Sequence, residues 1–144
     1  MLILEMEMLL TSQEESMVKE KTSKLKKSLW QIFSRYIRHR DNWTCITCGK
    51  YATGAGMHAG HYIPKSVGGI ELYFDEENVH AQCYHCNINL SGNSDIYLQF
   101  LLKKYGKKTI DRIRKLRYST SRSWAPDIYK KKISYYKNIL KQYE

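Results

Sequence analysis

Apolar residues recur at helical spacing in the first third of the chain. They form one stripe, made of Leu25, Leu29, Ile32, Phe33 and Tyr36. The stripe predicts a helix from about Lys21 to His39, and the polar pair Asp41 and Asn42 is expected to end it. In residues 1–20 the spacing of the apolar side chains fits both the alternation of a strand and the period of a helix. We therefore treat them as an N-terminal extension that is either unattached or a dimer contact.

The middle of the chain is predicted to form two short strands followed by a helix. Glycine-rich turns flank residues 57–63, which fit a first strand that Pro64 ends. Residues 78–83 fit a second short extended segment. The polar run 86–91 predicts a short helix, and Gly92 is expected to stop it.

Three more helices are predicted in the last third. The first covers residues 95–105 and ends at Gly106, and the second covers residues 109–116 with Thr109 as its N-cap. The third begins near Pro126, where a missing N–H costs little. It carries a narrow apolar seam formed by Tyr129, Ile133, Tyr136, Leu140 and Tyr143. We expect this seam to pack on the body of the fold, while a dimer seam remains the alternative.

Length and composition fit one domain with appended segments. The chain has 144 residues, of which 42% are hydrophobic and 26% charged, a balance that argues against disorder. The expected division is an extension over 1–20, a central domain with flanking helices over 21–116, and a linker with a helix over 117–144. No apolar run approaches the ~20 residues of a membrane helix, and the N-terminus lacks the features of a secretory signal. We therefore expect a cytoplasmic protein that does not bind membranes.

The net charge of +10 is concentrated in two blocks. Residues 21–50 hold eight Lys and Arg against one Asp, and residues 103–144 hold fourteen against three acidic residues. The intervening residues 51–102 are mildly acidic. Two basic blocks around a centre rich in Cys, His and Asn favour a polyanionic partner, with DNA as the expected one.

The four cysteines form two C-x2-C pairs, Cys45 with Cys48 and Cys83 with Cys86. Two such pairs are typical of one tetrahedral zinc site with four thiolate ligands. A disulfide framework fits poorly without a secretory signal, and a redox motif would need only one pair. The sequence therefore predicts a structural Zn²⁺ ion held by all four cysteines.

The centre of the chain resembles HNH nucleases of the ββα-metal kind. The resemblance lies in the run His58-Ala-Gly-His61-Tyr-Ile-Pro-Lys-Ser, in Asn78 and in Cys83-x-x-Cys86-Asn87. The cysteine pairs on either side match the zinc-knuckle version of that family. A longer match over residues 25–116 is to phage NinG-type recombination nucleases, which are linked to branched DNA intermediates. The resemblance implies an α+β fold with a small ββα-metal (HNH) core, a four-cysteine zinc knuckle site and flanking basic helices.

The resemblance also implies a role for three residues of the core. His61 is the expected general base that takes a proton from water, and Asn78 is expected to hold its imidazole by a hydrogen bond. Asn87 is the expected ligand, through its amide oxygen, of a catalytic Mg²⁺ or Mn²⁺. The alternative for His61 is a packed structural histidine.

One position departs from the HNH pattern. Many HNH sites carry an Asp or His directly before the base, where this chain has Gly60. His58 lies two residues earlier on the same strand face and is the expected replacement ligand, with His80 as the alternative. We expect His85 to bond the backbone of the second knuckle and His39 to lie on the surface.

Seven basic residues are the expected contacts with the DNA backbone: Lys65, Arg35, Arg38, Lys103, Lys104, Lys107 and Lys108. The resulting hypothesis is a phage- or prophage-encoded, metal-dependent DNA endonuclease that acts in recombination. Its expected substrate is branched DNA such as a Holliday junction, and a homodimer would suit a two-strand cutter. The alternatives are a non-catalytic zinc-stabilised DNA-binding module and a scaffold that binds partners through its C-terminal seam.

Overall fold

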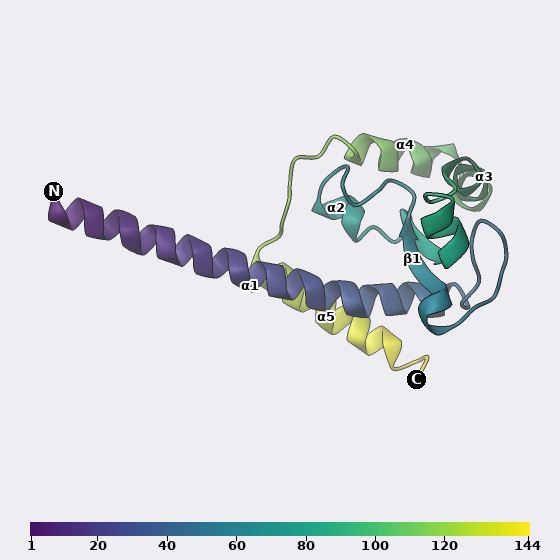
Figure 1. Cartoon of the computed structure of the whole chain (residues 1–144), viewed down its shortest axis with the longest axis horizontal. Coiled ribbons are helices and arrows are strands. Elements are labelled where there is room, and N and C mark those ends of the chain that lie inside the picture. Colours follow the sequence, from purple (N-terminus) through teal and green to yellow (C-terminus); the bar gives the residue numbers. More distant parts are fainter.

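In the computed structural model, which describes residues 1–144, one long helix projects from the rest of the fold (Figure 1). The projecting helix is the N-terminal half of α1 (Leu2–Arg40), whose C-terminal half lies in the body. The remaining elements follow in the order β1 (Met57–His61), α2 (Ile70–Tyr73), β2 (Val79–Cys83), α3 (Ser94–Tyr105), α4 (Lys107–Leu116) and α5 (Pro126–Leu140). Two helical turns, η1 (Gly54–Gly56) and η2 (His85–Asn89), precede β1 and follow β2. The fold is a small mixed α+β domain, as predicted.

The two predicted strands form one antiparallel two-stranded sheet. Met57 pairs with Cys83 at one end and His61 with Val79 at the other. The first strand ends two residues earlier than predicted. The N–H of Tyr62 still donates to the carbonyl of Asn78 at 2.9 Å, whereas the N–H of Ile63 donates to the side-chain oxygen of Asn78. The loop between the strands contains α2, a helix of four residues that the pattern did not predict.

The main core lies between α1 and α5. Leu29, Phe33 and Ile37 of α1 are fully buried, and Tyr129 and Tyr136 of α5 pack against the same cluster. Ile133 and Leu140 contribute to it as well. The apolar seam of the C-terminal helix therefore packs on the body of the fold, in agreement with the expectation from its spacing.

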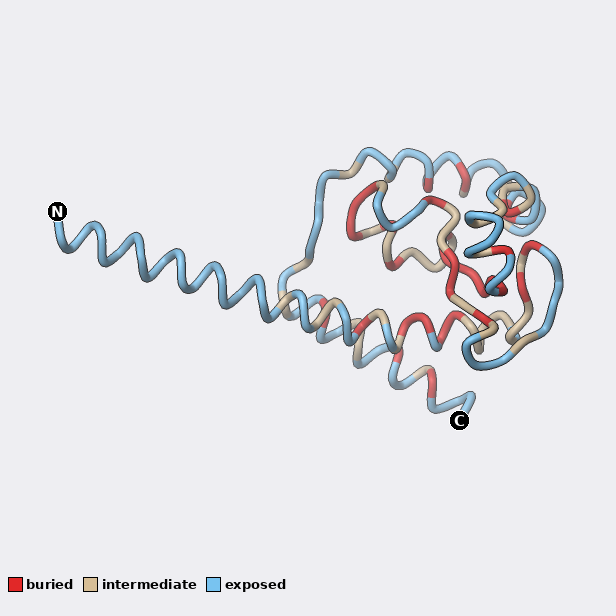
Figure 2. The backbone as a smooth tube through the Cα atoms, viewed as in Figure 1, coloured by how far each residue is buried: buried red, intermediate tan, exposed pale blue.

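Residues 1–21 are exposed along their whole length (Figure 2). They continue α1 as an unbroken helix, so the predicted start of the first helix at Lys21 was wrong. No glycine or proline interrupts the chain between Leu2 and Glu20, and that composition lets the helix extend without packing partners. No helix of the chain is long and apolar enough to span a membrane.

Helix α4 begins two residues earlier than predicted. This helix begins at Lys107, directly after Gly106, whose φ of 87° lies in the left-handed region. Thr109 is therefore inside the helix and is not its N-cap. Its hydroxyl instead lies 3.4 Å from a carboxylate oxygen of Glu77, in the loop before β2.

Candidate functional site

The four cysteines converge on one point beside the sheet. Their sulfur atoms all lie within 4.8 Å of one another, and none forms a disulfide. The sulfurs of Cys48 and Cys83 are 3.7 Å apart. A tetrahedral Zn²⁺ with Zn–S distances of about 2.3 Å would hold its sulfurs about 3.8 Å apart. The cluster could therefore bind a metal ion such as zinc, and its donors fit the ion predicted from the spacing.

Both C-x2-C segments are connected to the sheet through their backbones. The N–H of Ile46 donates to the carbonyl of Ala81 in β2 at 2.9 Å, which brings the first pair beside the second. In the second pair, Cys83 is the last residue of β2 and Cys86 lies in η2. The N–H of Cys86 points at the sulfur of Cys83. Three of the four cysteines are buried, and Cys48 is exposed.

A cleft of about 330 Å³ opens between α1, β1 and η2. Its lining combines His58 of β1, Asn87 of η2, Arg38 of α1 and Lys65 of the loop after β1. A second hollow of about 200 Å³ shares Lys65 and Asn87 with the first and adds His61. The structure thus brings together three polar side chains that the sequence singled out for catalysis and two of those expected to bind DNA. None of the residues that line either hollow is acidic.

His61 lies at the end of β1 with its ring stacked on the indole of Trp30, 5.3 Å between ring centroids. Its Nε2 is 2.9 Å from the carbonyl oxygen of Tyr73, which can only accept, so Nε2 carries the proton and Nδ1 keeps its lone pair. Burial, together with the nearby Lys65 charge, lowers the pKa of His61 to about 4, against the weaker opposing effect of the Tyr73 bond. At neutral pH the ring is therefore an uncharged base with one free nitrogen.

Asn78 does not hold the imidazole, which corrects the role expected for it. Its Oδ1 accepts from the N–H of Ile63 at 2.8 Å, and its Nδ2 donates to the carbonyls of Ile63 and Leu72, both at 3.1 Å. It is completely buried. Asn78, at the end of the loop between the strands, therefore holds both the start of that loop and α2. Leu72 directly precedes the Tyr73 carbonyl that orients His61.

Asn87 and His58 lie beside one another. The Nδ2 of Asn87 is 2.9 Å from the Nδ1 of His58, and both side chains line the cleft. Asn87 belongs to η2, a π-helical turn in which Leu90 N–H donates to the carbonyl of His85. Such i→i+5 turns are frequent at functional sites. The predicted short helix therefore exists here, in this wider form.

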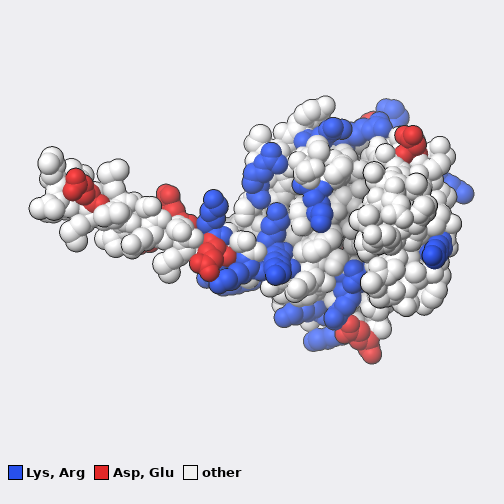
Figure 3. All heavy atoms as spheres, in the orientation of Figure 1, with Lys and Arg blue, Asp and Glu red and all other residues white.

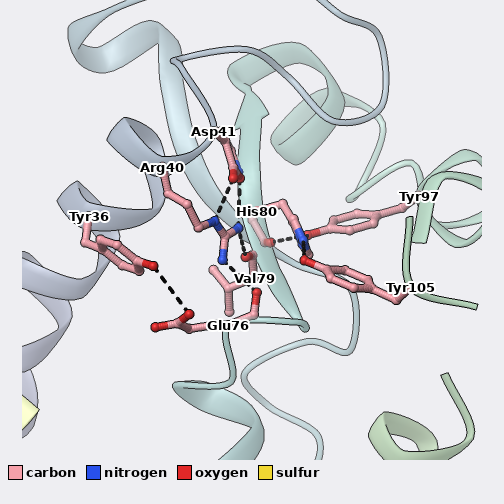
Figure 4. Close-up of polar contacts among 10 residues, drawn as sticks. Tyr36, Arg40, Asp41, Glu76, Val79, His80, Tyr97 and Tyr105 are labelled. Carbon is pink, nitrogen blue, oxygen red and sulfur yellow. Dashed lines mark hydrogen bonds and ion pairs between the residues drawn. The ribbon is translucent and has the colours of Figure 1, made fainter. Parts of the chain in front are cut away.

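His80 is excluded from the cleft. It is fully buried, with Nδ1 3.1 Å from the hydroxyl of Tyr97 and Nε2 2.7 Å from that of Tyr105 (Figure 4). The Tyr97 hydroxyl donates to the carbonyl of Gly60 at 2.8 Å, so it accepts from His80, and Tyr105 donates to His80. Burial lowers the pKa of His80 to about 3, with a contribution from Arg40. His80 is thus a structural residue and does not take the ligand role that was the alternative to His58.

The two remaining histidines differ from their expected places. His39 is only partly exposed, stacks on Tyr143 and accepts the indole N–H of Trp43 at 3.4 Å. It is therefore a packing residue at the end of α1. The imidazole of His85 faces the side chain of Asn89, 3.2 Å away, and not the backbone of the knuckle.

The basic residues expected to bind DNA divide into three groups. Arg38 and Lys65 line the cleft. Arg35 and Lys107 are engaged in ion pairs with Glu144 and Asp111. The others lie on α3 and α4 away from the cleft, namely Lys103, Lys104 and Lys108. Figure 3 shows Lys and Arg spread over the body, whereas the projecting helix carries acidic side chains toward its tip.

Several contributors to the site were not singled out as such by the sequence. Trp30 forms the surface under His61 and under the Nζ of Lys65, 5.0 Å from its ring. Lys26 lies over the ring of Tyr73, and burial and Lys65 lower its pKa. The Tyr73 carbonyl belongs to the backbone, so no residue type could have signalled it. The position of Trp30 on the predicted helix, beside the apolar stripe, was the only available clue to its place.

Fold and site together define a small α+β protein with a two-stranded sheet and a four-cysteine cluster that could hold a metal ion. The chain belongs to the family described as Bacteriophage Lambda NinG protein, whose sequence model matches residues 7–144. Protein ninG of Escherichia phage 933W is 39% identical over 88 residues, which are 60% of this chain and 43% of that protein. Protein ninG of Salmonella phage P22 is 39% identical, and that of Escherichia phage lambda 38%, over stretches of the same length that cover 42% of each. The matched stretch thus spans less than half the length of these relatives. No solved structure matches the chain.

Proposed function

We propose that this protein is a metal-dependent DNA endonuclease of the HNH type. The observation that carries the proposal is the neutral His61, whose Nδ1 is free and whose ring lines the same hollow as Asn87 and Lys65. The elements also follow the ββα order, with a strand that ends at His61, a loop, a second strand and a helical turn with Asn87. The hydrogen bonds of Asn78 hold this loop in place. They support the same interpretation, because the loop carries the Tyr73 carbonyl that accepts from His61.

Hydrolysis of a phosphodiester needs an activated water and neutralisation of the phosphate charge. In the proposed mechanism His61 Nδ1 takes the proton from the attacking water, while Tyr73 holds the ring through Nε2. Arg38 and Lys65 bind the phosphate. The Nε of Arg38 is buried without a partner in the chain, and burial lowers the pKa of its guanidinium. An unpaired, partly buried cation is costly, so an anion in the cleft would be favoured.

The cleft also fits a divalent cation such as Mg²⁺ or Mn²⁺. His58 and Asn87 would hold it, because imidazole nitrogen and amide oxygen both coordinate such ions. The Nδ2 of Asn87 already lies 2.9 Å from the Nδ1 of His58, which leaves the Oδ1 of Asn87 and the Nε2 of His58 as the atoms that would bind the ion. When bound, the ion would stabilise the charge on the leaving 3′-oxygen. The four cysteines would hold a separate Zn²⁺ with a structural role.

The substrate class rests on the family and on its resemblance to recombination nucleases. We propose branched DNA, such as a Holliday junction, in the cytoplasm of the bacterial host, with a homodimer as the form that would cut two strands. The test is incubation of the zinc-loaded protein with supercoiled plasmid and with a synthetic four-way junction, in Mg²⁺, in Mn²⁺ and in EDTA. Metal-dependent cutting would support the nuclease, and faster cutting of the junction than of a linear duplex would support the substrate.

A second candidate function is a non-catalytic, zinc-stabilised DNA-binding module. The observation that favours it is Gly60, which supplies no ligand at the position before His61, while the two hollows that Asn87 lines contain no carboxylate. Tight junction binding without cutting in any metal would select this alternative.

A further inference from the structure

Gln82 is a buried polar residue with an unsatisfied oxygen. It lies in β2 directly across from His58, and none of its surface is exposed. Its Nε2 donates to the carbonyl of Gly92 at 2.6 Å and points to the Thr47 hydroxyl at 3.4 Å. Its Oε1 has no hydrogen-bond partner. Leaving such an oxygen unpaired destabilises the fold, so native proteins normally supply it with a donor, a water or an ion.

The unpaired oxygen of Gln82 occupies the place of the missing ligand. A side chain at Gly60 would run into Oε1 of Gln82, would lie 2.9 Å from its Cβ and would lie 3.1 Å from Oδ1 of Asn87. Two acceptor oxygens therefore flank the spot where residue 60 would project its own side chain. Both are acceptors, and they repel each other unless a donor or a cation lies between them.

We propose that Gln82 supplies, through Oε1, the cation ligand that Gly60 cannot, next to Oδ1 of Asn87 and the imidazole of His58. The proposal rests on the function proposed above, because it concerns the divalent cation that His58 and Asn87 would hold there. It adds a residue from the second strand that the motif spacing does not reveal. It also accounts for Gly60, since any larger residue there would displace the Gln82 side chain.

The experiment measures Mn²⁺ binding to the full-length zinc-loaded protein without DNA, by calorimetry and by the loss of the free Mn²⁺ resonance signal. Gln82→Met keeps the length and removes the oxygen, and Gln82→Glu keeps an oxygen and adds charge. Gln99→Met, on an exposed position of α3, is the matched control. We expect one Mn²⁺ per chain in the wild type, binding about 10- to 100-fold weaker in Gln82→Met, and at least wild-type affinity in Gln82→Glu and Gln99→Met.

Equal Mn²⁺ affinity of Gln82→Met and the wild type, with zinc retained, would overturn the proposal, as would a wild type that binds no Mn²⁺. If Gln82→Met loses zinc, the Mn²⁺ affinity of Gly60→Ala is measured in its place. The methyl group of this variant must displace the Gln82 oxygen. Unchanged affinity in Gly60→Ala would overturn the proposal, and a loss of about tenfold or more would support it. Gln82-dependent Mn²⁺ binding without DNA cleavage would sustain this inference while refuting the nuclease function.

Discussion

The imidazole of His61 donates its Nε2–H to the carbonyl oxygen of Tyr73, 2.9 Å away. This one bond fixes the tautomer and leaves Nδ1 as the only proton acceptor of the ring. Asn78, the residue before β2, donates to the neighbouring Leu72 carbonyl, so the loop that orients the ring is itself held in place. The arrangement leads to testable expectations for pH, stability, metal content and DNA binding.

The pH dependence of cleavage should report the lowered pKa of His61. Burial and the Lys65 charge lower it to about 4, so the base stays neutral far below the ordinary histidine value of about 6.5. The single-turnover rate in Mg²⁺ should therefore stay flat from about pH 8 to about pH 5.5 in folded protein. A rate that falls tenfold per unit below pH 6.5 would contradict this assignment.

The stability of the fold should fall as the pH drops below about 6.5. The pKa of His80 is about 3 in the folded protein and near 6.5 in the unfolded chain, so between these values the unfolded state binds more protons. The stabilisation from keeping His80 neutral is complete above about pH 6.5. Between about pH 6.5 and pH 3 this contribution to the free energy of unfolding decreases by about 1.4 kcal/mol per pH unit. Urea unfolding at several pH values measures the total slope, to which His61 contributes in the same direction because its pKa in the folded protein is lowered to about 4.

Replacing His80 tests its structural role directly. His80→Leu leaves the hydroxyls of Tyr97 and Tyr105 without their buried partner and should lower the free energy of unfolding by about 2–4 kcal/mol. The pH slope below 6.5 should also become shallower. His85→Leu, at an exposed position, should change stability by less than about 0.5 kcal/mol. An equal effect of the two variants would rule out the buried network as the source of stability.

The cysteine cluster should hold one zinc ion per chain, and removing one ligand should release it. We expect Cys48→Ser and Cys86→Ser to lose zinc and to unfold the region between the knuckles, because binding of such an ion stabilises the fold around it. Elemental analysis and circular dichroism measure both effects. Stoichiometric zinc retained in either variant would refute the four-cysteine site.

DNA affinity should depend on the unpaired cations of the cleft more than on the paired ones outside it. Arg38→Ala and Lys65→Ala should each weaken junction binding and reduce the slope of affinity against salt by about one. Lys107→Ala, whose ammonium already pairs with Asp111 at 2.9 Å, is the matched control. Equal losses in all three variants would indicate a diffuse basic surface in place of a defined cleft.

The sequence predicted those parts of the fold whose signals are local. The apolar stripe through Leu29 and Phe33, the seam through Tyr136 and the glycine that ends α3 all lie where their patterns indicate. The extension of α1 back to Leu2 was left open, because residues 1–20 fit an alternating as well as a helical pattern and an exposed helix buries no stripe that decides between them. The helix α2 was missed because four residues are too few to show a period.

The candidate site was predicted in its residue types but not in its contacts. Spacing placed the cysteines together, and the family resemblance drew attention to His61 and Asn87. The bond partner of His61 is a backbone carbonyl twelve residues away, which only the folded loop brings near. The isolation of His80 from the cleft depends on Tyr97 and Tyr105, which come from α3 after the motif has ended.

The role of His61 as the general base is tested by comparing cleavage of a four-way junction by the wild type and by His61→Ala. Zinc content, circular dichroism and junction affinity are measured on the same samples, and His85→Ala is the matched control. We expect His61→Ala to cut at least about 100-fold more slowly in Mg²⁺ while zinc and DNA binding stay unchanged. Cleavage by His61→Ala at the wild-type rate, or a wild type that binds the junction without cutting it in Mg²⁺ or Mn²⁺, would contradict the account.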